Sequence, residues 1–149
     1  MEYHNLVADF ARRTQHNLHA IRTLNASTGQ SAFEVTALIN SMLGLLVFPQ
    51  QAFCDQIPEL PLGTMKANGW PLPQVAAGYP DVGNLRTLIR YVRNAISHFH
   101  IKFLTDSTDQ ISGLIIWNED RLGNKSWEGH FSLGELESFS NKFVDLLIT

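Results

Sequence analysis

The sequence predicts a mainly α-helical protein, a four- to five-helix bundle with a β-hairpin inserted before the C-terminal helix. Two observations carry this prediction. Apolar residues recur at three- and four-residue intervals in four segments, which is the spacing of one buried stripe on a helix. Only residues 111–131 show the alternation and β-branched content that are typical of paired strands. At 149 residues, the chain is expected to form a single domain over residues 1–149.

The N-terminal part of the chain predicts two long helices. The first covers residues 3–24. The second begins at Ser31, whose hydroxyl can form a capping box with Glu34, and it ends before Pro49. Because this second helix is so apolar, we expect it at the centre of the bundle or partly in a subunit interface. A short helix is expected over residues 50–56.

The middle of the chain has a different character. Residues 58–84 hold five of the six prolines together with four glycines. This composition predicts a long connection without regular structure.

The helix predicted over residues 85–103 carries the most informative side chains. Asp81 or Asn84 is the expected N-cap. The apolar stripe of this helix predicts its buried face, which consists of Leu85, Leu88, Ile89, Val92, Ala95, Ile96 and Phe99.

Three polar residues flank that stripe. At about 100° of turn per residue, Arg93 lies just off one edge of the stripe and His98 just off the other. Asn94 is one turn from His98, so their side chains are expected to be neighbours. A single helix does not enclose a ligand between Arg93 and His98. The simplest second surface is another copy of the same helix across a two-fold axis.

Positive charge is concentrated on the same segment. The net charge of −3 argues against a generally basic surface for nucleic acid. No acidic residue lies between Asp81 and Asp106, and the cations there are Arg86, Arg90, Arg93 and Lys102. Any contact with a polyanion is therefore expected to be confined to this segment.

The rest of the chain predicts a hairpin and a final helix. Residues 111–118 and 125–131 read as two strands joined by a turn, and a lone hairpin must pack on another surface to be stable. Glu128 and His130, on the polar face of the second strand, are interpreted as solvated. Ser132 and Glu135 then form a capping box. It opens a helix whose stripe is Leu136, Phe139, Phe143, Leu146 and Leu147.

Arg93 and Asn94, followed by three residues and His98 near the end of an amphipathic helix, resemble the signature of the HEPN superfamily. The likeness is strongest to small HEPN proteins of plasmids and other mobile elements. It implies a helical bundle that dimerises with its two motifs facing each other and cuts RNA without a metal or cofactor, as a toxin or defence factor. The implied partners are RNA, a second copy of the chain, and an antitoxin or another regulatory protein.

The side chains suit that chemistry. Imidazole carries protons near neutral pH, so we expect His98 to serve the attack of the RNA 2′-hydroxyl on phosphorus. The guanidinium of Arg93 is expected to stabilise the phosphorane. Asn94 is expected to orient the imidazole or hold the phosphate. Arg90 and Arg86 are either phosphate contacts or ordinary solvated charges.

Other interpretations stay open. The same chain could be a non-catalytic module that binds RNA, a nucleotide or a protein. Trp70 and its connection could stack on a base, although packing on the bundle is favoured. His16 and His19 have a spacing that can hold a metal, but a polar helix surface is preferred. His98 and His100 are not expected to share an ion, since residues two apart on a helix point to different sides.

The location is also predicted. Cys54 is the only cysteine, so an intramolecular disulfide is excluded. The N-terminus lacks the pattern of a signal peptide, and no apolar run approaches about 18 residues. A cytoplasmic protein is expected.

Overall fold

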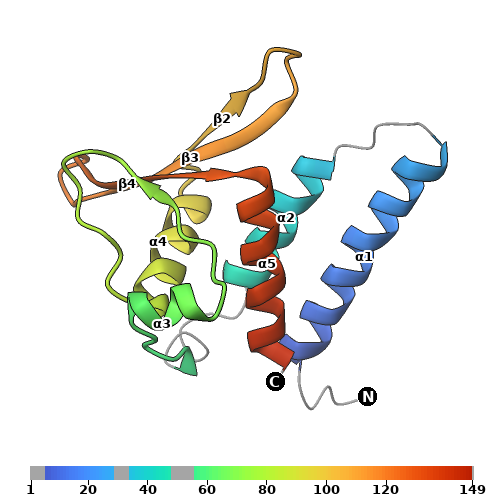
Figure 1. Cartoon of the computed structure of the whole chain (residues 1–149), viewed down its shortest axis with the longest axis horizontal. Coiled ribbons are helices and arrows are strands. Elements are labelled where there is room, and N and C mark those ends of the chain that lie inside the picture. The colour runs from blue at the N-terminus through green and yellow to red at the C-terminus, as the bar shows by residue number, and fades with distance from the viewer. Residues whose placement is uncertain (1–5, 29–33, 48–55, 149) are drawn as a thin grey trace.

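The computed structural model describes residues 6–28, 34–47 and 56–148 of the chain. The two predicted N-terminal helices are confirmed within these ranges. The capping box expected at Ser31, and residues 50–55 of the expected short helix, lie outside the described residues. The elements, in order, are α1 (Leu6–Thr28), α2 (Glu34–Val47), α3 (Leu62–Ala67), β1 (Gln74–Val75), α4 (Leu85–Ser97), β2 (Ile101–Thr105), β3 (Ile111–Glu119), β4 (Lys125–Ser132) and α5 (Leu133–Ile148) (Figure 1).

A four-stranded antiparallel sheet changes the fold class. Its strand order is β1-β4-β3-β2. The predicted hairpin is confirmed as β3 and β4, with Trp117 opposite Glu128 and Ile115 opposite His130. β2 and β1 add to its two edges, where they satisfy backbone groups that a lone hairpin would leave unpaired. The fold is therefore mixed α and β, and the prediction of a mainly α-helical bundle was wrong.

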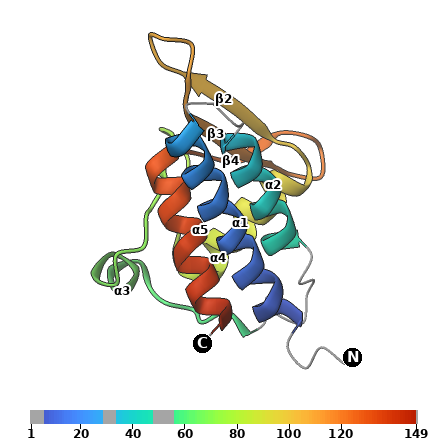
Figure 2. The same cartoon turned by 90° about the vertical axis from the view of Figure 1, so that its right-hand side faces the viewer.

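The helices lie on one side of this sheet. α4 and α5 pack directly against β3, α5 also packs against β4, and α1 packs on α2 and α5 (Figures 1 and 2). None of the described helices covers the opposite face of the sheet, and the β2–β3 hairpin projects beyond the helices (Figure 1). The core between the two layers includes Trp127, Phe131 and Phe139, all almost fully buried.

The burial pattern of α4 matches most of the predicted stripe. The buried residues are Leu85, Leu88, Ile89, Val92, Ala95 and Ile96. Asn84 is the N-cap, and its side-chain oxygen accepts a hydrogen bond from the backbone N–H of Thr87 at 2.9 Å. Of the two N-caps considered, Asn84 is therefore the correct one.

The end of α4 differs from the prediction. The helix ends at Ser97 with His98 as C-cap, rather than continuing to residue 103. Phe99 has a φ of 55°. The N–H of Phe99 donates to Ile96 O, and the N–H of His100 donates to Ala95 O, which is the Schellman arrangement that reverses the chain after a helix. Phe99, expected in the buried stripe, is 69% exposed.

The long connection before α4 is partly ordered into regular structure. It contains α3 and the two-residue strand β1, so the expectation of no regular structure over residues 58–84 was wrong. Trp70 is buried, and its ring meets that of Phe139 edge-on with centroids 5.8 Å apart. The connection packs on the body of the protein through Trp70, as favoured from the sequence.

The end of the chain follows the prediction closely. The N–H of Ser132 donates to a carboxylate oxygen of Glu135 at 2.7 Å, and the N–H of Glu135 donates to Ser132 Oγ at 3.2 Å. The capping box of α5 is thus confirmed.

Within the described ranges, no helix has both the length and the hydropathy needed to cross a bilayer.

Candidate active site at the C-terminal end of α4

Arg93 and Asn94 form one unit on the outer side of α4. Nη2 and Nε of Arg93 both donate to Oδ1 of Asn94, at 3.0 and 3.3 Å. Both residues are half-buried. The amide oxygen therefore limits the orientations of the guanidinium, and a preoriented guanidinium binds a planar pair of phosphate oxygens at a lower entropic cost.

His98 stands at the end of the same helix. Its side chain is exposed, and its backbone N–H donates to Asn94 O at 3.0 Å. The hydroxyl of Ser97 donates to Arg93 O at 2.7 Å, which ties the last turn of the helix to the arginine. Arg93, Asn94 and His98 thus share one helix end. The sequence suggested that Asn94 either orients the imidazole of His98 or holds the phosphate. Its side chain instead accepts hydrogen bonds from Arg93, which favours a role in holding the guanidinium.

A second histidine lies beside the first. The rings of His98 and His100 have centroids 5.7 Å apart and are tilted by 31°. The sequence argument that these residues point to different sides assumed a continuous helix. Because the helix ends before His98 and the chain reverses at Phe99, that argument does not apply.

The sheet supports His100. The imidazole stacks on Trp117 with centroids 5.5 Å apart and planes 9° from parallel. Nε2 of His100 lies 3.7 Å from Oε1 of Glu119, and the same oxygen accepts a hydrogen bond from Trp117 Nε1 at 2.9 Å. The backbone N–H of Trp117 donates to His100 O at 3.1 Å. Sequence reasoning missed Trp117 and Glu119, because no local signal indicates that residues 100 and 117 become neighbours.

A fixed cation extends this row of side chains. Nζ of Lys125 lies 4.8 Å from the centroid of the Trp117 ring, and it donates a hydrogen bond to Glu128. That hydrogen bond raises the pKa of Lys125 above its ordinary value of 10.5. Lys125 therefore stays charged at neutral pH, where it can attract a polyanion to this side of the sheet.

The two other predicted RNA contacts differ from each other. Arg90 is exposed, and its guanidinium carbon lies 5.9 Å from the centroid of the Tyr91 ring. Arg86 is engaged by the connection before α4, since its guanidinium donates to Ile57 O and pairs with Glu59. A phosphate at Arg86 would have to compete with these partners. Arg90 is therefore the better supported of the two.

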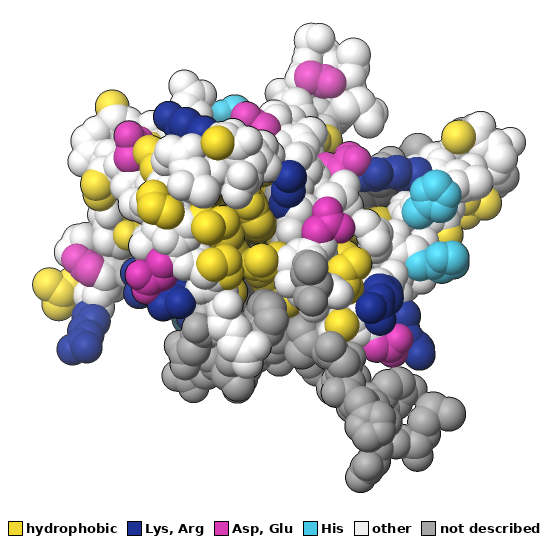
Figure 3. All heavy atoms as spheres, turned by 60° about the horizontal axis from the view of Figure 1, so that its bottom comes forward, with side chains coloured by type: hydrophobic (Ala, Val, Ile, Leu, Met, Phe, Trp, Pro, Cys, Tyr) yellow, Lys and Arg dark blue, Asp and Glu magenta, His cyan; other side chains and the backbone are white. Residues whose placement is uncertain are grey.

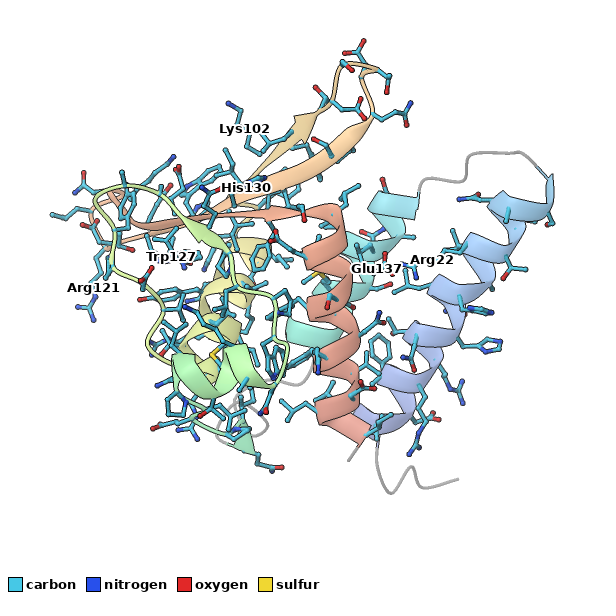
Figure 4. The ribbon with its side chains drawn as sticks, in the orientation of Figure 1. Arg22, Lys102, Arg121, Trp127, His130 and Glu137 are labelled. Carbon is cyan, nitrogen blue, oxygen red and sulfur yellow. The ribbon has the colours of Figure 1, made fainter. Side chains whose placement is uncertain are left out.

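Side chains of the sheet point to two different faces. Trp127 points toward α4, where its ring lies 4.9 Å from that of Tyr91, whereas Lys102 points to the face without helices (Figure 4). Glu128 and His130, interpreted as solvated, are half-buried on this second face. Glu128 pairs with Lys125 rather than being fully solvated.

His16 and His19 lie in a different part of the molecule. Together with Arg12, Arg22 and Ser140 they help line a pocket of about 470 Å³ between α1 and α5. Histidine and basic side chains gather along the outer side of α1 (Figure 3). Arg22 and Glu137 point toward each other across this pocket and form an ion pair of 2.7 Å (Figure 4).

Neither histidine pair is completed into a metal site by its surroundings. In the part of the chain that the structure describes, no three His, Cys, Asp or Glu side chains converge as ligands.

Comparison with known proteins gives one match. The family model described as HEPN pEK499 p136 matches residues 1–149. No curated protein and no solved structure matches the chain.

Proposed function

The chain belongs to the HEPN pEK499 p136 family, and from this premise we propose that it is a metal-independent endoribonuclease built on Arg93, Asn94 and His98. The HEPN superfamily includes ribonucleases and nucleotide-related modules. The single observation that carries the catalytic proposal is that one helix end holds both an oriented guanidinium and an exposed imidazole. An imidazole can transfer a proton and a guanidinium can stabilise the phosphorane, and RNA cleavage without a metal can use both.

The proposed reaction uses the nucleophile that RNA supplies. His98 removes the proton of a 2′-hydroxyl, whose oxygen attacks the adjacent phosphorus and displaces the 5′-oxygen. Arg93 stabilises the additional negative charge of the phosphorane, while Asn94 holds its guanidinium in place. The displaced 5′-oxygen takes up a proton from a general acid, so the products are a 2′,3′-cyclic phosphate and a 5′-hydroxyl.

The proposed active unit is a homodimer. An exposed imidazole at a helix end does not surround a phosphate, and a second copy of α4 would add Arg93 and His98 from the other side. Mixing inactive Arg93→Ala and His98→Asn proteins tests this. If the site is composite, heterodimers combine an intact arginine from one chain with an intact histidine from the other and regain part of the activity. Absence of recovery, with subunit exchange verified, would contradict a composite site.

Cleavage itself is tested with labelled RNA in the presence of EDTA. We expect the wild type to produce 2′,3′-cyclic phosphate ends. His98→Asn should lower the rate by about 10²–10⁴-fold, and Arg93→Ala by about 10²–10³-fold. Arg121→Ala is the matched control, because this exposed arginine lies in the β3–β4 turn (Figure 4). Equal cleavage by wild type and His98→Asn would reject the proposal.

A role as a toxin or defence factor follows if the nuclease acts on cellular RNA. Expression of the wild type should then arrest growth of a bacterial host, whereas His98→Asn at the same protein level should not. Rescue by a co-expressed neighbouring gene would identify an antitoxin. Growth unaffected by an active nuclease would remove the toxin role while leaving the chemistry intact.

The second candidate is a non-catalytic binding module. The pocket of about 470 Å³ between α1 and α5 favours it, because Arg12, His16, His19 and Arg22 contribute to its lining and Glu137 is its one acidic residue. Such a lining suits an anionic ligand such as a nucleotide. Binding of RNA or nucleotide without cleavage, unchanged in His98→Asn and weakened in Arg12→Ala, would select this function.

A further inference from the structure

His100 is held more firmly than an ordinary surface histidine. Its side chain is 23% exposed, and it is fixed by the parallel stack on Trp117 and by Glu119. Its backbone is bonded on both sides, through its N–H to Ala95 O and through its carbonyl oxygen to the N–H of Trp117. The side chain is thus positioned by two elements, α4 and β3, rather than by its own loop.

Glu119 lies beside one nitrogen of this histidine. Its carboxylate is anchored by the indole N–H of Trp117 and lies 3.7 Å from Nε2 of His100. A carboxylate beside an imidazole restricts the orientation of the ring. Because Nε2 of His100 lies on the side of Glu119, Nδ1 is the ring nitrogen that is left for a bound ligand.

The neighbouring histidine completes a pair. Cleavage by 2′-hydroxyl attack needs one group to accept a proton and another to supply one, each within about 2.6–3.2 Å of its oxygen. In the transition state both oxygens are attached to the same phosphorus, so the two groups must lie close together. Ring centroids 5.7 Å apart, as in His98 and His100, meet this demand within one chain.

We propose that His100 is the second catalytic residue, the general acid that protonates the leaving 5′-oxygen while His98 acts as the base. This inference rests on the proposed ribonuclease function. The bond from the 2′-oxygen to phosphorus forms and the bond from phosphorus to the 5′-oxygen breaks. The 2′-hydroxyl proton passes to His98, and a proton from His100 passes to the 5′-oxygen. Glu119 is a positioning residue, and the partner subunit is not needed to supply the acid.

The backbone at Phe99 makes this pairing possible. A non-glycine residue with a positive φ is uncommon and strained, and such strain is often found at functional sites. Here the left-handed residue separates the two histidines in sequence. Without that reversal the helix would continue and turn the two imidazoles to different sides.

A change of leaving group tests the assignment. One substrate is an oligoribonucleotide that the wild type cuts, and the other carries sulfur in place of the 5′-oxygen at that position. A thiolate leaves without a proton, so it removes the need for an acid. The variant is His100→Phe, which keeps an aromatic ring on Trp117 but cannot transfer a proton.

We expect His100→Phe to cut ordinary RNA about 10²–10⁴-fold more slowly than wild type, and to cut the sulfur substrate at nearly the wild-type rate. His98→Asn should be slow on both. Glu119→Gln should show a smaller loss that sulfur also rescues. Its matched control is Asp109→Asn, which removes an exposed carboxylate between β2 and β3 and should have no effect on either substrate.

The results distinguish the role of His100 from the nuclease function itself. Unchanged cleavage of ordinary RNA by His100→Phe, or equal losses on both substrates, would overturn the role of His100 while leaving the nuclease proposal standing. A wild type that cuts no RNA would overturn the nuclease proposal and the acid assignment together. Unfolding by urea, compared with wild type, verifies that His100→Phe is folded.

Discussion

Nη2 of Arg93 donates a hydrogen bond of 3.0 Å to Oδ1 of Asn94, the next residue in the chain. Adjacent residues on a helix do not face each other, so the contact depends on the guanidinium folding back along the helix surface. The polar residue after the motif arginine thereby acquires a specific role, which is to orient the group proposed to bind the phosphorane.

Asn94→Ala tests this relationship. The variant loses a hydrogen bond to a charged group, so Arg93 should be less well oriented and cleavage about tenfold slower. Asn94→Asp should lose more, because a carboxylate beside Arg93 neutralises the charge that the phosphate needs. RNA cleavage rates in EDTA measure both. If Asn94→Ala cuts as fast as wild type, the contact has no catalytic role.

Phe99→Gly should stabilise the protein. Glycine adopts a positive φ without the steric cost that Phe99 pays at 55°, and the exposed ring leaves little packing to lose. We expect a gain of about 1 kcal/mol in the free energy of unfolding, measured by urea denaturation. Phe99→Ala is the control and should show no such gain. A less stable Phe99→Gly would indicate that the ring makes contacts important for folding.

Asn84→Ala should destabilise α4. The substitution removes the side-chain acceptor for the N–H of Thr87, which typically costs about 1 kcal/mol. Asn84→Asp should retain the cap and most of the stability. Thermal unfolding followed by circular dichroism distinguishes the three proteins. Equal melting temperatures for Asn84→Ala and wild type would mean that the cap contributes nothing.

Two glycines should respond to alanine in opposite directions. A Cβ at Gly113 would lie 2.6 Å from the carbonyl oxygen of Phe131 in the paired strand, whereas a Cβ at Gly134 meets no atom within 4 Å. Gly113→Ala must push β3 and β4 apart, at a cost of about 1–3 kcal/mol. Gly134→Ala, in the first turn of α5, should add about 0.4–1 kcal/mol by restricting the unfolded chain. Urea denaturation of both variants provides the comparison.

Asp120 should make stability depend on acid pH. Backbone hydrogen bonds from Asn124 and Leu122 lower the pKa of its carboxyl below the ordinary 3.8. The folded state therefore binds this proton less readily than the unfolded state. The stabilisation is present above about pH 3.8 and is lost as the pH falls through the lower, folded pKa. The difference in free energy of unfolding between wild type and Asp120→Asn should thus shrink on acidification. A difference that is constant with pH would contradict this.

The sequence alone determined the features that depend on neighbouring residues. The stripe of α4, its cap at Asn84, the hairpin of β3 and β4 and the capping box at Ser132 are all encoded within short segments. Periodicity and capping report on such local structure. The spacing of Arg93, Asn94 and His98 also indicated the family, which the match over the whole chain confirms.

The tertiary structure alone decided how those pieces meet. β1 has two residues and no periodicity to detect, and β2 is made from a segment that reads as the end of a helix. β1 becomes a strand because it pairs with β4, far away in the chain, and β2 becomes one because the end of α4 at Ser97 frees it to pair with β3. The end of α4 could not be predicted either, because Phe99 occupies the position after the helix where glycine usually marks a reversal of the chain. His100, Trp117 and Glu119 could come together only once β2 had paired with β3, so no local pattern could predict the second half of the site.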